Sequence, residues 1–179
     1  MRNRFLERFT KEQLIDLIEL YSKNWLAMDG VWFQSIENEL GIAEAMKHDS
    51  NAWSRFTKIE AQKIKHFLKL PEKSGIDGLS QALSLRFYAN INKDEIILKE
   101  NELIYKVLEC RVQNARSSKG MEFHPCKPVG VIEYAEFAKV IDSRFECEAL
   151  SCYPEITDST CSCSWKFTLT DEKKREEVL

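Results

Sequence analysis

Six cysteines, the residues of this chain best suited to chemistry, all lie in its second half. They are Cys110, Cys126, Cys147, Cys152, Cys161 and Cys163, and the first 109 residues contain none. A cysteine thiolate is a strong nucleophile and a ligand for soft metals. We therefore expect the chemistry of this protein in its C-terminal half, and a scaffold with a pocket wall in its N-terminal half.

Cys126 stands in the segment His124-Pro125-Cys126-Lys127-Pro128, where a helix is predicted to begin. Free backbone N–H groups at a helix N-terminus, together with Lys127, favour a thiolate, so we expect a lowered pKa for this thiol. Such a thiol suits either metal ligation or nucleophilic attack, with His124 as a further ligand or as the base. The alternative is that Cys126 is a small buried capping residue.

The other cysteines fall near the ends of predicted strands. Antiparallel pairing of the last two strands brings Cys152 close to Cys161 or Cys163, and the loop after Cys110 returns the chain to Cys126. We expect zinc or an iron–sulfur cluster bound by Cys110, Cys126, Cys152 and Cys163. The spacing contains no diagnostic Cys-x-x-Cys pair. Reactive thiols, or plain packing of small apolar side chains, are the alternatives.

Residues 1–90 are predicted to be almost wholly helical. Thr10 and Gln13 form a capping-box pattern, and apolar residues at helical spacing follow as far as Met28. Asp29-Gly30 is expected to end this first helix. The later helical segments are expected at 32–40, at 43–46, from Asp49-Ser50 to just before Pro71, and at 79–88.

The pattern changes to β-strands after Asn90. Strands are expected at 96–98, 103–112, 145–150 and 161–169, with a mobile loop at 113–123 and a helix at 127–141. This order predicts an α+β fold in which N-terminal helices pack on a four-stranded antiparallel sheet with β-β-α-β-β order. We expect one domain over 1–179, made of a helical half (1–90), a cysteine-rich half (91–170) and a charged tail (171–179).

Composition excludes several classes of function. A net charge of -3 gives no concentrated basic surface for nucleic acid. No apolar run reaches the roughly 20 residues that cross a membrane, and the N-terminus lacks the apolar core of a signal peptide. We therefore expect a cytoplasmic protein with reduced thiols. Nucleotide-binding and serine-hydrolase motifs are absent from the sequence.

Aromatic side chains are frequent in the helical half and suggest the wall of an apolar pocket. Trp25, Asp29, Trp32 and Glu37 are the candidate pocket residues, since two carboxylates here fall beside large aromatics. The alternatives are core packing for the aromatics, a helix cap for Asp29 and a solvated helix face for Glu37. A partner could also bury exposed aromatics such as Trp32, which makes a homodimer possible.

Several of these segments resemble an uncharacterised bacterial and archaeal family whose members are labelled "cytosolic protein". The resemblance covers roughly residues 20 to 170 and rests on the following stretches: Trp25-x-x-x-Asp29-Gly30-x-Trp32-Phe33, Cys110-Arg111-x-Gln113-x-Ala115-Arg116, Phe123-x-Pro125-Cys126-Lys127-Pro128-Val129-Gly130, Ile141-Asp142-x-Arg144, Cys152-x-Pro154 and Cys163-x-Trp165-x-Phe167. This family is more distantly similar to L-2-amino-thiazoline-4-carboxylate hydrolase-like proteins and to the four-vinyl-reductase domain.

That distant similarity implies the fold of haem nitric-oxide-binding domains and transport-particle subunits, and a small apolar ligand such as a tetrapyrrole or acyl chain. Relatives tend to carry Cys-x-x-Cys-Pro-Pro after the third strand, whereas this chain has Cys147-x4-Cys152-Tyr153-Pro154. The resemblance therefore gives Cys147 and Cys161 no role.

Three functions follow from the sequence as expectations. The first is a cytoplasmic small-molecule-binding or sensor protein with a cysteine-coordinated zinc or iron–sulfur centre. The second is a thiol-dependent hydrolase of a small cyclic or amide substrate, with Cys126 as nucleophile and His124 as base. The third is an assembly module with structural cysteines. The sequence does not identify the ligand.

Overall fold

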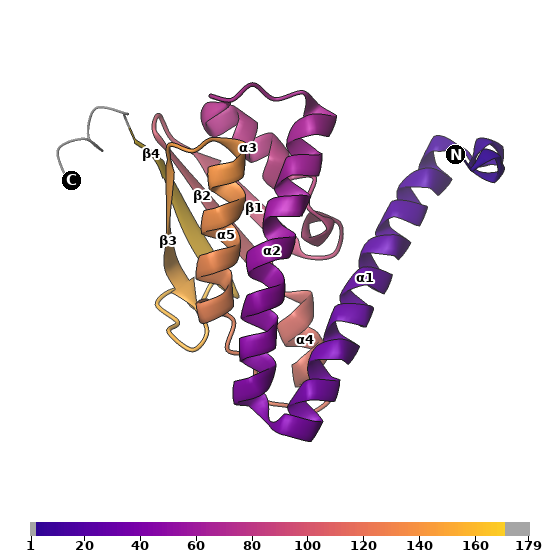
Figure 1. The fold of residues 1–179 in the computed structure, drawn as a ribbon, viewed down its shortest axis with the longest axis vertical. Helices are drawn as coiled ribbons and strands as arrows, with labels where there is room; N and C mark the ends of the chain where they lie inside the picture. The colour runs from indigo at the N-terminus through magenta and orange to yellow at the C-terminus, as the bar shows by residue number, and fades with distance from the viewer. Residues whose placement is uncertain (1–2, 171–179) are drawn as a thin grey trace.

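Two long helices that form a V dominate the N-terminal half of the computed structural model, which describes residues 3–170 (Figure 1). After a short 3-10 helix, η1 (Arg4–Arg8), α1 spans Lys11–Leu40 and α2 spans Ile42–Leu68. The predicted capping box is confirmed: the Thr10 hydroxyl accepts from the Gln13 N–H at 3.2 Å, and the Gln13 side chain accepts from the Thr10 N–H at 2.9 Å. Gly41 alone separates the helices, with a φ of 86° that favours glycine.

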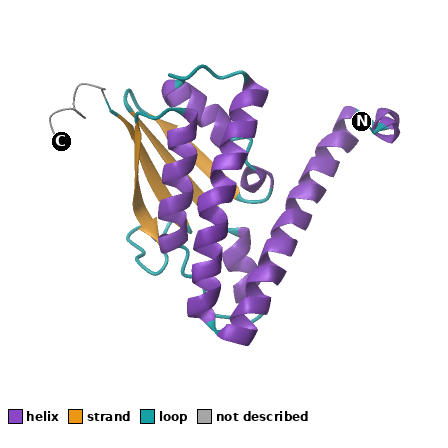
Figure 2. Cartoon of the chain, viewed as in Figure 1, coloured by secondary structure: helices purple, strands orange, loops and turns teal. Residues whose placement is uncertain are grey.

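A four-stranded antiparallel sheet forms the second half. The strands, in the spatial order β1-β2-β4-β3, are β1 (Lys93–Leu98), β2 (Glu102–Glu109), β4 (Cys163–Leu169) and β3 (Phe145–Cys152). Helix α3 (Gly75–Leu83) and η2 (Phe87–Asn90) precede the sheet, while α4 (Arg111–Ser117) and α5 (Lys127–Ile141) lie between β2 and β3. The predicted α+β class and antiparallel sheet are confirmed, and Figure 2 shows the helices on one side of the sheet.

Helix α5 lies between the sheet and α2 and forms the centre of the core. Phe137 on α5 and Trp165 and Phe167 on β4 are almost completely buried. Gly130 lets the helix approach β4 closely, because a Cβ atom there would lie only 2.7 Å from the Trp165 ring. The bounds 127–141 predicted for this helix are confirmed.

The predicted helix break at Asp29-Gly30 is wrong, since α1 runs through both residues. A glycine inside a helix costs about 1 kcal/mol relative to alanine, and the packing of α1 against α2 and η2 outweighs this local preference. The predicted start at Asp49-Ser50 is also wrong: α2 is continuous from Ile42, and Asp49 lies within it. Both errors came from residues that are typical of helix ends.

Three further predictions of element bounds need correction. The segment predicted as a loop at 113–123 begins inside a helix, α4 (Arg111–Ser117). The fourth N-terminal helix is α3 (Gly75–Leu83) followed by η2, rather than 79–88. The last strand begins at Cys163, so Cys161 precedes it. The predicted charged tail, 171–179, lies outside the described residues.

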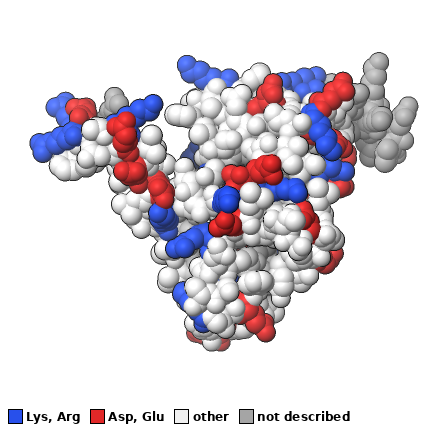
Figure 3. All heavy atoms as spheres, turned by 180° about the vertical axis from the view of Figure 1, so that it is seen from behind, with Lys and Arg blue, Asp and Glu red and all other residues white. Residues whose placement is uncertain are grey.

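The surface has mixed charge. Figure 3 shows basic and acidic side chains interspersed over one face, as expected from the small net charge. Among the helices of residues 3–170, none is both long enough and apolar enough to cross a membrane.

Candidate functional site

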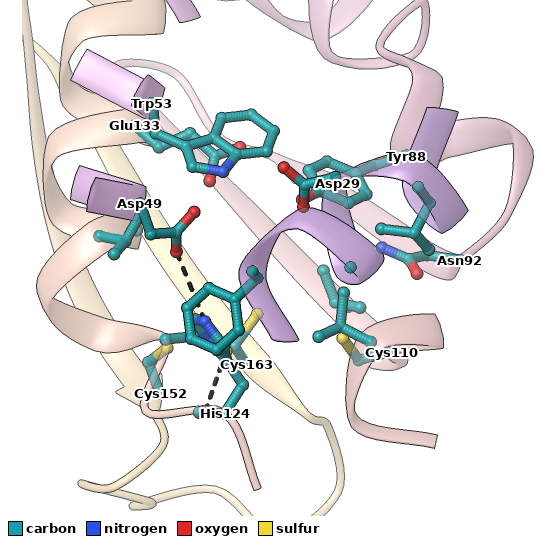
Figure 4. A pocket seen from close by; sticks show the side chains of 18 of the residues that line it. Asp29, Asp49, Trp53, Tyr88, Asn92, Cys110, His124, Glu133, Cys152 and Cys163 are labelled. Atoms are coloured by element: carbon teal, nitrogen blue, oxygen red, sulfur yellow. Dashed lines mark hydrogen bonds and ion pairs between the residues drawn. The ribbon is translucent and has the colours of Figure 1, made fainter. Parts of the chain in front are cut away.

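A pocket of about 160 Å³ lies between α1, α2, η2, the start of α5 and the sheet (Figure 4). Its walls are mainly apolar and include the aromatic rings of Phe33, Trp53, Tyr88, Tyr134 and Trp165. A few polar side chains point into this apolar space. Because an apolar cavity with a small number of placed polar groups is the usual form of a ligand site, we take this pocket as the candidate functional site.

Cys126, His124 and Asp49 form a chain of polar contacts along one wall of the pocket. The Cys126 Sγ lies 3.3 Å from His124 Nδ1, and His124 Nε2 lies 3.4 Å from Asp49 Oδ2. The His124 ring packs against Phe33 with 4.6 Å between ring centroids. Two residues that lie two positions apart in the sequence thus meet Asp49, a carboxylate on α2 that was not predicted to join them.

Gln113 on α4 fixes the segment that carries this pair. Its side-chain amide accepts from the His124 N–H at 2.9 Å and donates to the His124 carbonyl at 2.9 Å. The Nε2 atom of Gln113 also lies 3.1 Å from Cys126 Sγ, and this thiol in turn lies 3.2 Å from the His124 carbonyl oxygen. Gln113 was not predicted as a site residue, because the segment from residue 113 onward was predicted to be a loop. A helix that begins at Arg111 would have turned Gln113 toward the chain around Cys126.

The lowered pKa predicted for Cys126 is wrong. Burial raises the pKa of this thiol well above its usual value, and negative charge at Cys110 and Cys163 would raise it further. The helix N-terminus and Lys127 are present as predicted, but Lys127 instead pairs with Glu155. Enclosure by the pocket walls outweighs the effect of the helix dipole, so Cys126 is a neutral thiol here.

All four cysteines predicted as metal ligands line this pocket. Cys110 and Cys126 precede α4 and α5, and Cys152 and Cys163 are cross-strand partners in the β3–β4 ladder. Nevertheless, no three His, Cys, Asp or Glu side chains within residues 3–170 come together in an arrangement that could hold a metal ion. The predicted convergence on one region is therefore found without a formed coordination site.

The two remaining cysteines are outside the pocket lining. Cys147 lies on β3, where burial raises its pKa to about 12. Cys161 is buried just before β4, and burial raises its pKa as well. All six cysteines are free thiols.

Asp29 is one of three carboxylates in the pocket lining, with Asp49 and Glu133. Asp29 points into the pocket from α1, and no described residue donates a hydrogen bond to its carboxylate (Figure 4). Burial and the negative charge of Asp49 raise its pKa to about 6, against a smaller opposing effect of His124. Asp29 therefore has unused capacity to accept a hydrogen bond or to face a positive charge.

The other predicted pocket residues lie outside this lining. Trp25 stacks on Phe56 at 5.0 Å, and Trp32 is 64% exposed on the outer side of α1. Glu37 makes a bidentate ion pair with Arg116, with N–O distances of 2.7 and 2.8 Å. Through this pair Glu37 fastens α1 to α4, and Arg116 rather than Glu37 reaches the pocket.

A family model described as "Family of unknown function (DUF6125)" matches residues 7–169. The chain belongs to DUF6125. No curated protein and no solved structure matches it. The prediction of an uncharacterised family is thus confirmed, while the links to thiazoline-carboxylate hydrolases, to the four-vinyl-reductase domain and to the haem-binding and transport-particle fold stay predictions.

The DUF6125 match spans every pocket residue, from Leu26 to Trp165. The pocket therefore lies entirely within the part of the chain that the family model describes.

Proposed function

We propose that this protein binds a small, largely apolar molecule in the pocket, as a carrier or sensor of that molecule. The observation that supports this most strongly is the aromatic-walled cavity of about 160 Å³. An apolar cavity of about 150 Å³ accepts benzene. The ligand that fits is therefore about the size of one ring or a short chain, and a tetrapyrrole is too large without movement of the walls.

The polar groups of the pocket narrow the ligand class further. Asp29 receives no hydrogen bond from residues 3–170, and it stands beside a second carboxylate, Asp49, which contacts His124. A ligand that offers an N–H or O–H donor, or a cationic amine, would satisfy Asp29, whereas an anionic ligand would meet two carboxylates. Stacking on Trp53 or Tyr88 would hold its apolar part.

Binding can be tested with matched one-ring fragments that differ only in carrying an amine, an alcohol or a carboxylate. We expect ligand-observed NMR to detect the amine and the alcohol, and to detect the carboxylate weakly or not at all. Val129→Phe, which fills the pocket, should abolish binding. Val131→Phe on the exposed side of the same helix is the matched control. Equal binding of all three fragments, or full binding to the Val129→Phe variant, would refute the proposal.

A second candidate function is thiol chemistry at Cys126. The contacts from Sγ to His124 and from His124 to Asp49 support it, because a base oriented by a carboxylate can accept the thiol proton. In this proposal His124 Nδ1 takes the thiol proton, Asp49 stabilises the imidazolium, and the thiolate attacks the carbonyl carbon of a small cyclic or other amide. The C–N bond then breaks as the imidazolium protonates the leaving nitrogen, and water hydrolyses the resulting thioester to regenerate the thiol. Asp49 is then a positioning residue for His124.

Alkylation by iodoacetamide tests this second candidate. We expect modification of Cys126 to slow by about tenfold or more in His124→Gln and less strongly in Asp49→Asn. Cys161→Ser is the control that should leave the rate unchanged, since Cys161 is outside the pocket lining. A Cys126 alkylation rate independent of both His124 and Asp49 would rule out activation through this chain.

The cysteine-bound zinc or iron–sulfur centre is retained as a third proposal, supported by the position of Cys110, Cys126, Cys152 and Cys163 around one pocket. Binding would require their side chains to move together. Elemental analysis of protein purified without oxygen, beside a variant with all four cysteines changed to serine, tests it. A stoichiometric metal present only in the unmodified protein supports the proposal, and its absence from both rejects it.

A further inference from the structure

Helix α1 carries a second apolar stripe, which borders the face that packs on the protein body and meets it at Trp25, whose ring stacks on Phe56. Its members recur at alternating intervals of four and three residues, which is the spacing of the two core positions of a coiled coil. The stripe consists of Leu14, Ile18, Tyr21, Trp25, Met28 and Trp32. The face that packs on the body is different and contains Ser22, Leu26 and Phe33.

Most of this stripe has no partner within residues 3–170. Tyr21, Met28 and Trp32 are each more than 60% exposed, and Ile18 and Trp25 are about half exposed. The N-terminal half of α1 leaves the body of the protein, so other elements do not cover it (Figure 1). A continuous row of large exposed apolar side chains is typical of an interaction surface.

We propose that this stripe pairs α1 with α1 of a second copy of the chain, in an antiparallel arrangement. Half of a large side chain corresponds to about 100 Å², so the exposed stripe residues and their neighbour Val31 offer roughly 600 Å² per chain. Two copies would then bury roughly 1,200 Å², which reaches the lower limit of stable protein interfaces. A second copy therefore supplies a matching surface of sufficient area.

The order of residues in the stripe favours antiparallel pairing in which the two-fold axis passes close to Lys23 of both copies. That arrangement places Leu14 opposite Trp32 of the second copy, and by the two-fold symmetry Trp32 opposite its Leu14. Ile18 then faces Met28, and Tyr21 faces Trp25. Parallel pairing would instead put each tryptophan against its own copy.

Sedimentation velocity of the full chain from about 1 to about 100 µM tests the pairing. We expect a species of twice 20.9 kDa, and about tenfold or greater weakening of the dimer in Met28→Glu and in Trp32→Glu. Phe67→Glu, a similar change at an exposed position of α2, should leave the dimer unchanged. Circular dichroism melting would verify that each variant is folded.

Cross-linking through an introduced cysteine distinguishes the two directions. In the antiparallel pair the two copies of residue 14 lie about 27 Å apart, because 18 residues of helix separate position 14 from position 32, so Leu14→Cys should form no disulfide with its own copy. Parallel pairing would place the two introduced thiols side by side, and a 14–14 disulfide would refute the antiparallel direction. A monomer at every concentration, or a dimer insensitive to both Met28→Glu and Trp32→Glu, would overturn the proposal. A monomer that binds phosphatidylcholine vesicles through the stripe would replace the second copy by a lipid surface.

Discussion

The carboxyl group of Asp29 should weaken the folded state at neutral pH. Burial in the pocket wall and the nearby charge of Asp49 raise its pKa from the ordinary 3.8 to about 6. A carboxyl group with a raised pKa holds its proton more tightly in the folded chain than in the unfolded chain. Stability therefore falls as pH rises from about 4 to about 6, and the deficit is fully present above pH 6. The difference between the two pKa values corresponds to about 3 kcal/mol at most.

Asp29→Asn keeps the shape of the side chain and removes its charge. We expect the free energy of unfolding to increase by about 1 to 3 kcal/mol at pH 7.5, and to differ little from the unmodified protein at pH 4. Urea denaturation followed by circular dichroism between pH 4 and 8 measures both values. Asp16→Asn, on an exposed part of the same helix, is the matched control and should show no such gain.

A gain of equal size at pH 4 and pH 7.5 would refute this reasoning, because it would show an effect unrelated to ionisation. A loss of stability at pH 7.5 would show that the charged form of Asp29 is satisfied in the folded protein. The same variant should bind the amine fragment more weakly, which ties the stability effect to the pocket.

Three other changes have effects that the structure predicts. Gly130→Ala should destabilise the protein by about 1 to 3 kcal/mol in urea denaturation, because the new methyl group would clash with the buried Trp165 ring. An unchanged free energy of unfolding would show that α5 moves away from β4 at no cost. Arg86→Met should lower the free energy of unfolding by about 3 to 5 kcal/mol, since it removes the cation that lies 2.5 Å from the buried Glu133 carboxylate. A decrease below about 1 kcal/mol would contradict this. Asp142→Asn should lower the free energy of unfolding by about 2 kcal/mol at pH 7. Burial raises the pKa of Asp142, but hydrogen bonds, of which the one from the Arg144 side chain has the largest effect, lower it to about 2. That stability is present above about pH 4 and is lost as pH falls to about 2, so an equal cost at pH 2 and pH 7 would be contrary evidence.

The fold could be predicted well where local signals and packing agree. The capping box at Thr10, the proline at the start of α5 and the alternation along β4 all correspond to the observed elements. Prediction failed where a local signal was overruled by packing. Asp29-Gly30 and Asp49-Ser50 look like helix ends, yet both lie inside long helices that bury one face.

The candidate site was predictable only in part, because its members come from distant segments. The pair His124 and Cys126 is visible in the sequence, whereas Asp49 is far away along the chain. A signal for Asp49 exists: it occupies the same row of α2 as the buried Ala45 and Trp53, at intervals of four residues. A carboxylate in a buried row is unusual and marks a polar site. The sign of the Cys126 pKa shift could not be foreseen, because it depends on how completely the pocket walls enclose the thiol.

A single glycine, Gly41, joins α1 to α2, so any rotation of α1 about this residue moves the far end of the helix more than the part beside the pocket. Phe33 and Asp29, on the wall of the pocket, lie about 12 and 18 Å along the helix from Gly41, while Leu14 lies about 40 Å from it. A rotation about Gly41 that moves Asp29 by about 1 Å therefore moves Leu14 by about 2 Å. The part of α1 near Gly41 faces the cavity, whereas the distant part carries the first members of the outward apolar stripe, Leu14, Ile18 and Tyr21. A molecule that pushes on the pocket wall would thus have its displacement doubled at the far end of the helix.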